Sequence, residues 1–170
     1  MCIRDRPLDT VGEICVQGYC NMIEYHANTE ATTETIDKQG WLHTGDLGTM
    51  DSRGYVTVTG RVKEMIIRGG ENMFPAEIEN VLLEHPSVLE AAAVGLPDDK
   101  WGEIVACFVR AATGETIDPQ DLHAHCRQNM SPQKTPVLWF QVEAFPLTGS
   151  GKIRKFELRD RYLAGEYESL

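Results

Sequence analysis

Three glycine-marked segments of the chain each carry a charged side chain that could contact a ligand. The first is Thr44-Gly45-Asp46, which we expect at the end of a strand. A carboxylate on a tight turn can accept hydrogen bonds from two hydroxyl groups at once, which suits the vicinal hydroxyls of a ribose. The alternative is a turn aspartate that bonds only to its own backbone. The segment by itself leaves both interpretations open.

The second segment is GRVKEMIIRGGENMFPAEIE, residues 60–79. Arg61 offers a fixed fork of hydrogen-bond donors. Gly69 and Gly70 lack side chains, so a ligand or another backbone can pass close to them. The alternative is a tight turn between a strand and a helix, and the segment alone does not decide between the two.

The third segment is PLTGSGKIRK, residues 146–155. Two glycines and small hydroxyl residues predict a mobile loop that presents Lys152. A lysine ammonium can offset negative charge that develops on a phosphate or a carboxylate. The segment is not a Walker phosphate loop, because Ile153 follows Gly151-Lys152 where that motif needs Ser or Thr. The alternative is a solvated loop lysine.

The elements that would position these segments can be predicted from hydrophobic spacing and turn residues. In the first part, residues 11–18 alternate apolar and polar and predict a strand, and residues 28–37 predict a short helix. A strand pair follows, with its turn at residues 52–54. The TVTGRV stretch is our candidate domain boundary.

The second part predicts a compact α+β unit, a small sheet flanked by helices. A short strand ends at the two glycines, and a helix begins at Pro75. Asp118 is a good helix N-cap. In chain order we expect a helix to His85, strands at 88–95 and 103–110, a helix at about 118–130, a strand at 138–142 and a helix at about 155–164.

Composition excludes several classes of function. The formal net charge of −10 argues against general nucleic-acid binding, which needs a basic face. Five cysteines without a Cys-x-x-Cys pair favour reduced thiols and a cytoplasmic protein. No apolar run approaches the roughly 18 residues of a membrane span. The one basic stretch, 152–161, could bind an anionic ligand or form the solvated face of a helix.

We expect no metal site in the chain. His123, His125 and Cys126 are the group that could suggest one. They fall in a helical pattern, where neighbours one and two residues apart do not share a face. We therefore interpret them as ordinary helix residues.

The order and spacing of the three segments are more specific than any one of them. WLHTGDLG (41–48), residues 60–79 and residues 146–155 resemble the last three signature motifs of the adenylate-forming superfamily. That superfamily includes acyl- and aryl-CoA synthetases, firefly-type luciferases and nonribosomal peptide adenylation domains. The resemblance extends from about Val11 to Leu163. GGEN followed by Pro-x-Glu-Ile-Glu is most similar to fatty or medium-chain acyl-CoA synthetases.

The resemblance implies a division of the chain and a role for each segment. Residues 1–62 would be the C-terminal end of the large AMP-binding domain, and residues 63–170 a mobile lid domain. Asp46 and Arg61 would bind the ribose of ATP, Lys152 would be catalytic and Lys63 would be the hinge. The tunnel for coenzyme A would be bordered by Gly69, Gly70, Glu71 and Trp101. Gln133 and Thr135 depart from the family pattern at positions near the coenzyme A phosphates.

The implied activity is ATP-dependent activation of a carboxylic acid, of the fatty-acid type, as an acyl-adenylate, followed by transfer to coenzyme A. The implied small molecules are the acid, ATP with Mg²⁺, and coenzyme A. The phosphate loop, the adenine site and the acyl pocket lie upstream in the family. We therefore expect the chain to need a missing N-terminal domain and to be inactive alone. Two alternatives stay open: part of an adenylation domain that feeds a carrier protein, and a stand-alone binding module without chemistry.

Overall fold

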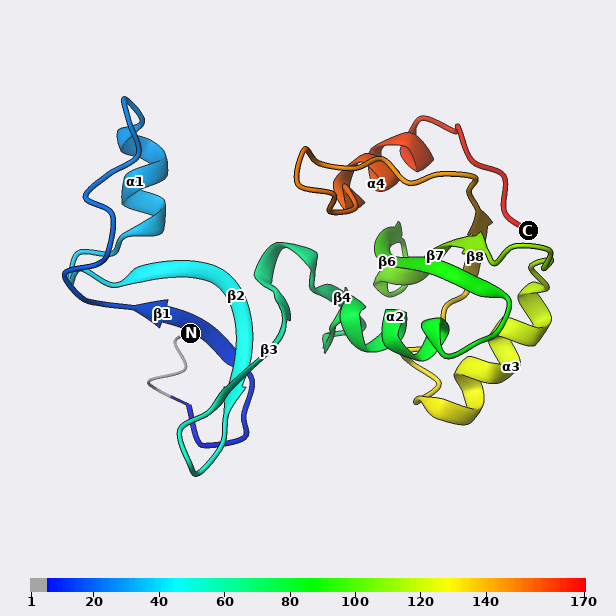
Figure 1. Ribbon diagram of the computed structural model, residues 1–170, viewed down its shortest axis with the longest axis horizontal. Helices are drawn as coiled ribbons and strands as arrows, with labels where there is room; N and C mark the ends of the chain where they lie inside the picture. The colour runs from blue at the N-terminus through cyan, green and yellow to red at the C-terminus, as the bar shows by residue number, and fades with distance from the viewer. Residues whose placement is uncertain (1–5) are drawn as a thin grey trace. The chain divides into compact units, whose positions relative to one another are not determined.

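The computed structural model describes residues 6–170, and the chain divides into two compact units that meet between Lys63 and Glu64. Each unit has its own strands and helices (Figure 1). The fold class is the expected one, a small β-rich part followed by an α+β part.

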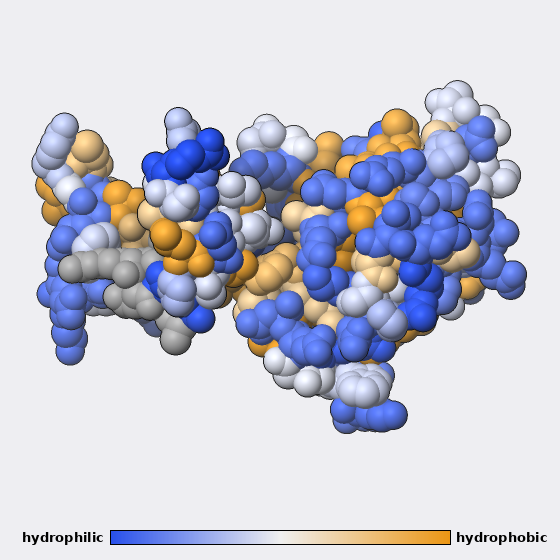
Figure 2. Space-filling model, turned by 90° about the horizontal axis from the view of Figure 1, so that it is seen from below, coloured by the Kyte–Doolittle hydropathy of each residue, from blue (hydrophilic) through white to orange (hydrophobic). Residues whose placement is uncertain are grey.

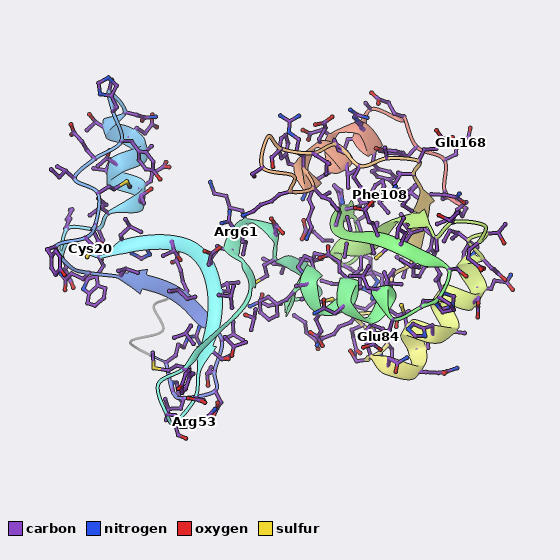
Figure 3. All side chains as sticks on the ribbon, in the orientation of Figure 1. Cys20, Arg53, Arg61, Glu84, Phe108 and Glu168 are labelled. Atoms are coloured by element: carbon purple, nitrogen blue, oxygen red, sulfur yellow. The ribbon has the colours of Figure 1, made fainter. Side chains whose placement is uncertain are left out.

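Unit 1 is a three-stranded antiparallel sheet with one short helix. Its elements are β1 (Gly12–Val16), α1 (Thr29–Thr35), β2 (Leu42–Met50) and β3 (Val56–Arg61), and the strand order is β1-β2-β3. Asp51 closes the turn between β2 and β3 by accepting from the backbone N–H groups of Arg53 and Tyr55 at 2.9 and 3.0 Å. Arg53 marks the tip of this hairpin, and Arg61 lies at the other end of β3 (Figure 3).

Unit 2 contains five strands and three α-helices among the described residues. They are preceded by a 3₁₀ turn, η2 (Val62–Glu64), which spans the boundary between the units. The elements are β4 (Ile66–Arg68), β5 (Glu71–Met73), α2 (Pro75–Leu83), β6 (Val88–Asp98), β7 (Gly102–Ala111), α3 (Pro119–Asn129), β8 (Leu138–Gln141) and α4 (Lys155–Leu163). The strand order is β5-β4-β7-β6, and β8 pairs with β7 in parallel.

The sheet of unit 2 is covered on both faces. Side chains from one face of β6 and β7 pack with α2 and α3, and the alternate side chains pack with α4. Figure 1 shows α4 on one side of these strands and α2 and α3 on the other. Phe108 on β7 belongs to the α4 face, where it stacks on Phe140 with a centroid distance of 4.8 Å. Burial on both faces explains why β6 and β7 are continuously apolar rather than alternating.

The starts of α2 and α3 have local causes. Pro75 and Pro119 occupy first helical positions, where the missing N–H costs nothing. The Asp118 carboxylate accepts from the N–H of Gln120 at 2.9 Å and caps α3.

The surface seen in Figure 2 is mainly hydrophilic, with smaller hydrophobic areas between the hydrophilic ones. Across residues 6–170, no helix has the length and apolar character needed to cross a bilayer.

Candidate functional site

The Thr44-Gly45-Asp46 segment lies inside β2, and the expectation that it ends a strand was wrong. β1 pairs with His43 before this segment and with Leu47 after it, and β3 pairs from Asp46 onward, so the strand continues through it. Gly45 has a positive φ of 74°, and Figure 1 shows β2 strongly bent. The Thr44 hydroxyl donates to the carbonyl of Ile14 at 2.8 Å and accepts from the N–H of Asp46 at 3.1 Å. These bonds fix the backbone that carries Asp46.

Asp46 and Arg61 are brought together by the sheet. They are cross-strand partners on β2 and β3, and Arg61 Nε lies 2.8 Å from Asp46 Oδ1. The Arg61 side chain is 56% exposed and that of Asp46 32% exposed, so the pair adds little to stability. A carboxylate has about four acceptor positions. Asp46 can therefore be oriented by Arg61 and still accept hydrogen bonds from a ligand.

Glu13 is a residue near this segment that the sequence analysis did not single out. Its Oε1 accepts from the N–H of Gly45 at 3.1 Å, and its Oε2 lies 2.8 Å from His43 Nδ1. Glu13 thus holds the chain on both sides of Thr44. Alternation in residues 11–18 places Glu13 on a strand, but its partners come from a residue pairing that the sequence does not reveal.

The two glycines form a hairpin rather than the strand-to-helix turn that was the alternative. Arg68 and Glu71 are paired across β4 and β5, so Gly69 and Gly70 are a two-residue loop. Their φ values are 58° and 86°, as a type I′ turn requires. The Gly69 N–H donates to the carbonyl of Trp101 at 2.8 Å. Three of the proposed coenzyme A residues therefore sit in one hairpin, and the fourth contacts it.

The indole of Trp101 is a half-exposed aromatic surface flanked by two cations. Lys100 Nζ lies 4.8 Å and Arg68 Cζ 5.7 Å from the ring centroid. The Arg68 guanidinium also donates to the carbonyl of Gln133, which ties the loop after α3 to β4. An aromatic face beside positive charge suits a ligand with a flat ring and phosphates.

The loop between α3 and β8 contributes one cation that is already paired. Lys134 Nζ lies 2.6 and 2.7 Å from the two carboxylate oxygens of Glu77. Thr135 is buried, and its hydroxyl donates to the carbonyl of Ser131 at 3.2 Å. The side chain of Thr135 is therefore used inside unit 2 rather than presented to a ligand.

Lys152 lies at the surface on a closed loop. Leu147 and Ile153 form an isolated β-bridge at its base. The N–H of Lys152 donates to the hydroxyl of Thr148 at 3.0 Å, and its carbonyl accepts from the N–H of Thr148 at 2.8 Å. Gly151 takes a φ of 80°. The backbone is thus held by its own turn while the lysine side chain is exposed.

The rest of the basic stretch 152–161 is paired with carboxylates of unit 2. Arg159 Nη1 lies 2.9 Å from Glu103, and Arg154 and Arg161 both contact Glu157. Lys155 is also paired, with Glu64 and Glu79. The structure therefore favours a paired helix face over an anion site for this stretch, with Lys152 as the exception.

Lys155 links four elements through a shielded ion-pair network. Its Nζ lies 2.8 Å from Glu79 and 3.0 Å from Glu64, and only 18% of its side chain is exposed. Glu79 also accepts from the N–H of Ala93 at 2.8 Å. Burial lowers the pKa of Lys155, but the charges and hydrogen bonds of Glu79 and Glu64 outweigh it and raise that pKa above 10.5. Glu64 follows Lys63, so the network fixes the chain directly after the candidate hinge.

The glycine hairpin and the Lys152 loop belong to different faces of unit 2. Ile66 and Met73, on the two hairpin strands, pack into the α2 and α3 cluster. Ile153, beside Lys152, packs against the α4 cluster. Lys63 is exposed in η2 and is the last residue of unit 1. The structure thus brings Asp46 to Arg61 and Gly69 to Trp101, and it keeps Lys152 apart from the hairpin.

The three residues of the rejected metal interpretation do not share an environment. Cys126 is buried in the α2 and α3 cluster, and His123 is exposed. His125 Nε2 lies 2.8 Å from the carbonyl of Val81. Burial raises the pKa of the Cys126 thiol to about 11, which makes it a poor source of thiolate.

Comparison with known proteins identifies relatives along most of the chain. Residues 77–152 match the family described as AMP-binding enzyme C-terminal domain. The mitochondrial medium-chain acyl-CoA ligase ACSF2 of Rattus norvegicus is 44% identical over 154 residues, 91% of this chain and 25% of the relative. The fatty acid–[acyl-carrier-protein] ligase ScoC of Streptomyces coeruleorubidus is 45% identical over 159 residues, 94% of this chain and 30% of the relative. The chain thus spans under a third of the length of these relatives.

Solved structures give the same result. ATP-bound MatB from Rhodopseudomonas palustris superposes with a TM-score of 0.87 at 34% identity, covering 92% of this chain and 31% of that one. The o-succinylbenzoate CoA synthetase MenE from Bacillus subtilis, in complex with its acyl-adenylate intermediate, gives a TM-score of 0.84 at 34% identity, covering 91% and 31%. At 34% identity the chain is similar to these structures in sequence as well as in fold.

Proposed function

The chain belongs to the C-terminal part of the adenylate-forming superfamily, and from this premise we propose that it supplies the ribose-binding end and the lid of an AMP-forming acid–thiol ligase. Such a ligase joins a carboxylate to the α-phosphate of ATP and releases pyrophosphate. The thiol of coenzyme A then attacks the acyl carbon, AMP leaves and the thiol proton passes to solvent. The observation that carries the proposal is the presence of Asp46, Arg61 and exposed Lys152 in the expected order.

Asp46 and Arg61 would bind the ribose of ATP. Their 2.8 Å contact orients the carboxylate, and the bonds of Thr44 and Glu13 hold the strand beneath it. The ribose hydroxyls would donate to Asp46. Because the pair is partly exposed, water weakens its electrostatic interactions. These interactions would become stronger once a bound nucleotide excludes water from the pair.

Lys152 would stabilise the charge that develops as the acyl phosphate bond forms. Its ammonium is exposed on a turn whose backbone is fixed, so the side chain can reach a partner without reorganising the loop. A positioned cation acts most strongly where water is excluded. We assign it to the first half-reaction.

Lys63 would be the hinge between two arrangements of the lid. Lys152 and the Gly69-Gly70 hairpin belong to different faces of unit 2, so one face at a time could meet a reaction centre. A rotation absorbed by a few backbone angles is ordinary for domain closure. After rotation Gly69, Gly70 and Glu71 of the hairpin would border the path of the pantetheine thiol, and Trp101 would lie near the coenzyme A nucleotide.

We assign no Mg²⁺ ligand to this chain. Magnesium prefers an octahedral set of oxygen ligands. Among residues 6–170, the group of His, Cys, Asp and Glu side chains close enough to hold an ion is Glu13, Cys15 and His43, which offers sulfur and nitrogen as well as oxygen. The Mg²⁺ of ATP would be held elsewhere in the enzyme.

A hybrid enzyme would test the proposal. In it, residues 11–163 of this chain replace the matching C-terminal part of rat ACSF2. We expect the hybrid to release pyrophosphate in an acid-dependent manner, and the ACSF2 body without a lid to be at least about a hundredfold slower, the scale of losing one charge-stabilising group. The 170-residue chain alone should release none. Activity of the chain alone, or a folded hybrid no faster than the truncated body, would contradict the proposal.

A second acceptor is favoured by one relative. ScoC, at 45% identity, is described as a ligase that uses an acyl carrier protein. Coenzyme A and a loaded carrier protein present the same pantetheine thiol, but only coenzyme A brings a free nucleotide. The cations beside Trp101 favour coenzyme A. Supplying the hybrid with each acceptor in turn discriminates them, and isothermal calorimetry of the chain alone with ATP and coenzyme A tests the binding-module alternative.

A further inference from the structure

The pairing of β1 with β2 brings three different metal-ligating side chains to one place in unit 1. Glu13 and Cys15 are two residues apart on β1, and Cys15 is the cross-strand partner of His43 on β2. The register shifts between Glu13 and Cys15. Such irregularities re-aim side chains, and this one turns Glu13 toward His43.

The separations of the ligand atoms suit a small tetrahedral ion. The Glu13, Cys15 and His43 ligand atoms all lie within 4.8 Å of one another. Cys15 Sγ lies 3.6 Å from His43 Nδ1. Bond lengths of about 2.3 Å to sulfur and 2.0 Å to nitrogen require about 3.5 Å between such atoms around tetrahedral zinc. The 2.8 Å contact between Glu13 and His43 would need to open by about half an ångström to admit the ion.

The chemical types of the three ligand atoms also determine which ion the site prefers. Thiolate and imidazole favour zinc and other late transition metals over magnesium or calcium. Three protein ligands leave the fourth position of a tetrahedral zinc to water. Two of the ligand side chains also contact groups behind them. His43 Nε2 lies 3.7 Å from Asp37 Oδ2, and Glu13 Oε1 accepts a hydrogen bond from the N–H of Gly45. A carboxylate behind a ligating histidine fixes the orientation of its ring.

All three side chains are partly exposed to solvent. Cys15 is partly buried and lines a pocket of about 430 Å³ together with Ile14, Trp41 and Met50. The side chains of His43 and Glu13 are 33% and 16% exposed. The group is therefore shielded enough to bind an ion and open enough to load one.

We propose that Glu13, Cys15 and His43 form a binding site for a thiophilic divalent cation, with zinc as the best-fitting ion. Cys15 binds as the thiolate and releases its proton to solvent. His43 binds through Nδ1, and its ring proton moves to Nε2 on the side of Asp37. Glu13 exchanges its contact with His43 for the ion while Oε1 keeps the N–H of Gly45. The site joins β1 to β2 directly beside Thr44-Gly45-Asp46, and it stands whether or not the proposed ligase function holds.

Cobalt(II) is the probe, because a thiolate bound to it gives a charge-transfer absorption band. We expect the 170-residue chain to develop this band on titration with Co²⁺, and zinc to abolish it by displacement. Cys15→Ala and His43→Ala should lose it. The matched controls Cys20→Ala and His26→Ala, at exposed positions of the same unit, should keep it. No band, a band that survives in Cys15→Ala, or one lost in Cys20→Ala would overturn the proposal.

Glu13→Gln keeps the thiol, the imidazole and the size of the side chain. If Cys15→Ala or His43→Ala disturbs folding, which circular dichroism would reveal, this variant still tests the site. We expect the band to remain and the affinity for Co²⁺ to fall at least about tenfold, the lower limit for loss of a supporting metal contact. Unchanged affinity in a folded Glu13→Gln protein would remove Glu13 from the site and contradict the three-ligand proposal.

Discussion

The backbone N–H of Gly69 donates a 2.8 Å hydrogen bond to the carbonyl of Trp101, and a Cβ atom at Gly69 would lie 3.0 Å from the indole Cε3. The absence of a side chain at Gly69 is thus what allows the indole to lie against the hairpin. This contact gives a structural reason for glycine at position 69 that does not depend on any ligand.

Gly69→Ala should displace Trp101, whereas Gly70→Ala should not. Both positions have positive φ, so each substitution should destabilise unit 2 by about 1–2 kcal/mol. Only the Cβ at Gly69 meets the indole, because nothing lies within 4 Å of one at Gly70. The measurements are urea denaturation and the NMR resonance of the Trp101 indole N–H. An indole resonance that moves equally in both variants would contradict the described contact.

Arg61→Ala should weaken ATP use in the hybrid enzyme without a large loss of stability. The exposed pair with Asp46 contributes about 0–1 kcal/mol to folding. Loss of a charge-assisted contact to the ribose side of the site should raise the KM for ATP about tenfold, which corresponds to about 1.4 kcal/mol. The control is Arg53→Ala, which removes an exposed pair with Asp51 at 2.8 Å in the same unit. Equal effects of the two variants on KM would exclude a ribose role for Arg61.

Lys155→Met should destabilise unit 2 by about 3 kcal/mol, because it leaves Glu79 and Glu64 without their cation in a shielded site. Lys152→Ala, at an exposed position, should stay within about 0.5 kcal/mol of the parent. Chemical denaturation of both variants measures the difference. A Lys155→Met loss no larger than that of Lys152→Ala would show that the network does not stabilise the fold.

The same network predicts a pH dependence at the alkaline end. The pKa of Lys155 is higher in the folded protein than its ordinary 10.5. Its contribution to stability is therefore complete below about pH 10.5 and is lost as the pH rises through the folded-state pKa. Comparing urea unfolding of the parent and Lys155→Met between pH 8 and pH 11.5 isolates this contribution. The gap between the two proteins should narrow above about pH 10.5, and a gap that widens would contradict the assignment.

Thiol reactivity should separate the cysteines by burial. Burial raises the pKa of Cys107 well above its ordinary value and that of Cys126 to about 11, so both hold almost no thiolate near neutral pH. Cys20 is exposed. Iodoacetamide followed by peptide mass spectrometry should show Cys20 labelled in the native protein and Cys107 and Cys126 labelled only after denaturation. Rapid native labelling of Cys126 would contradict the buried core between the sheet and its helices.

Much of the fold followed from local signals. The mainly apolar stretches at residues 88–95 and 103–110 indicated strands, and Pro75, Asp118 and Pro119 marked the starts of helices. The β5 strand was missed because residues 71–73 are too short and polar to show a period. Thr44-Gly45-Asp46 was expected at a strand end, whereas β2 continues through it because β1 pairs with the residues on either side of the segment and β3 pairs from Asp46 onward.

The candidate site was only partly predictable for a similar reason. Asp46, Arg61 and Lys152 stand in motifs, so their types and spacing pointed to them. The residues that hold the surrounding chain in place do not stand in motifs. Glu13 meets His43 across 30 residues, and Lys155 meets Glu64 across 91 residues. Such contacts depend on strand register and on helix packing, which short-range patterns do not encode.

The most direct test of the account is to separate the two half-reactions in the hybrid enzyme. Lys152→Ala should slow acyl-adenylate formation by at least about a hundredfold, the scale of removing one group that stabilises developing charge. Thioester formation from supplied acyl-adenylate and coenzyme A should stay near the parent rate. Lys38→Ala, at an exposed position of unit 1, should leave both steps unchanged. Equal loss of both half-reactions in Lys152→Ala, or loss of neither, would contradict a lid that presents Lys152 for the first step alone.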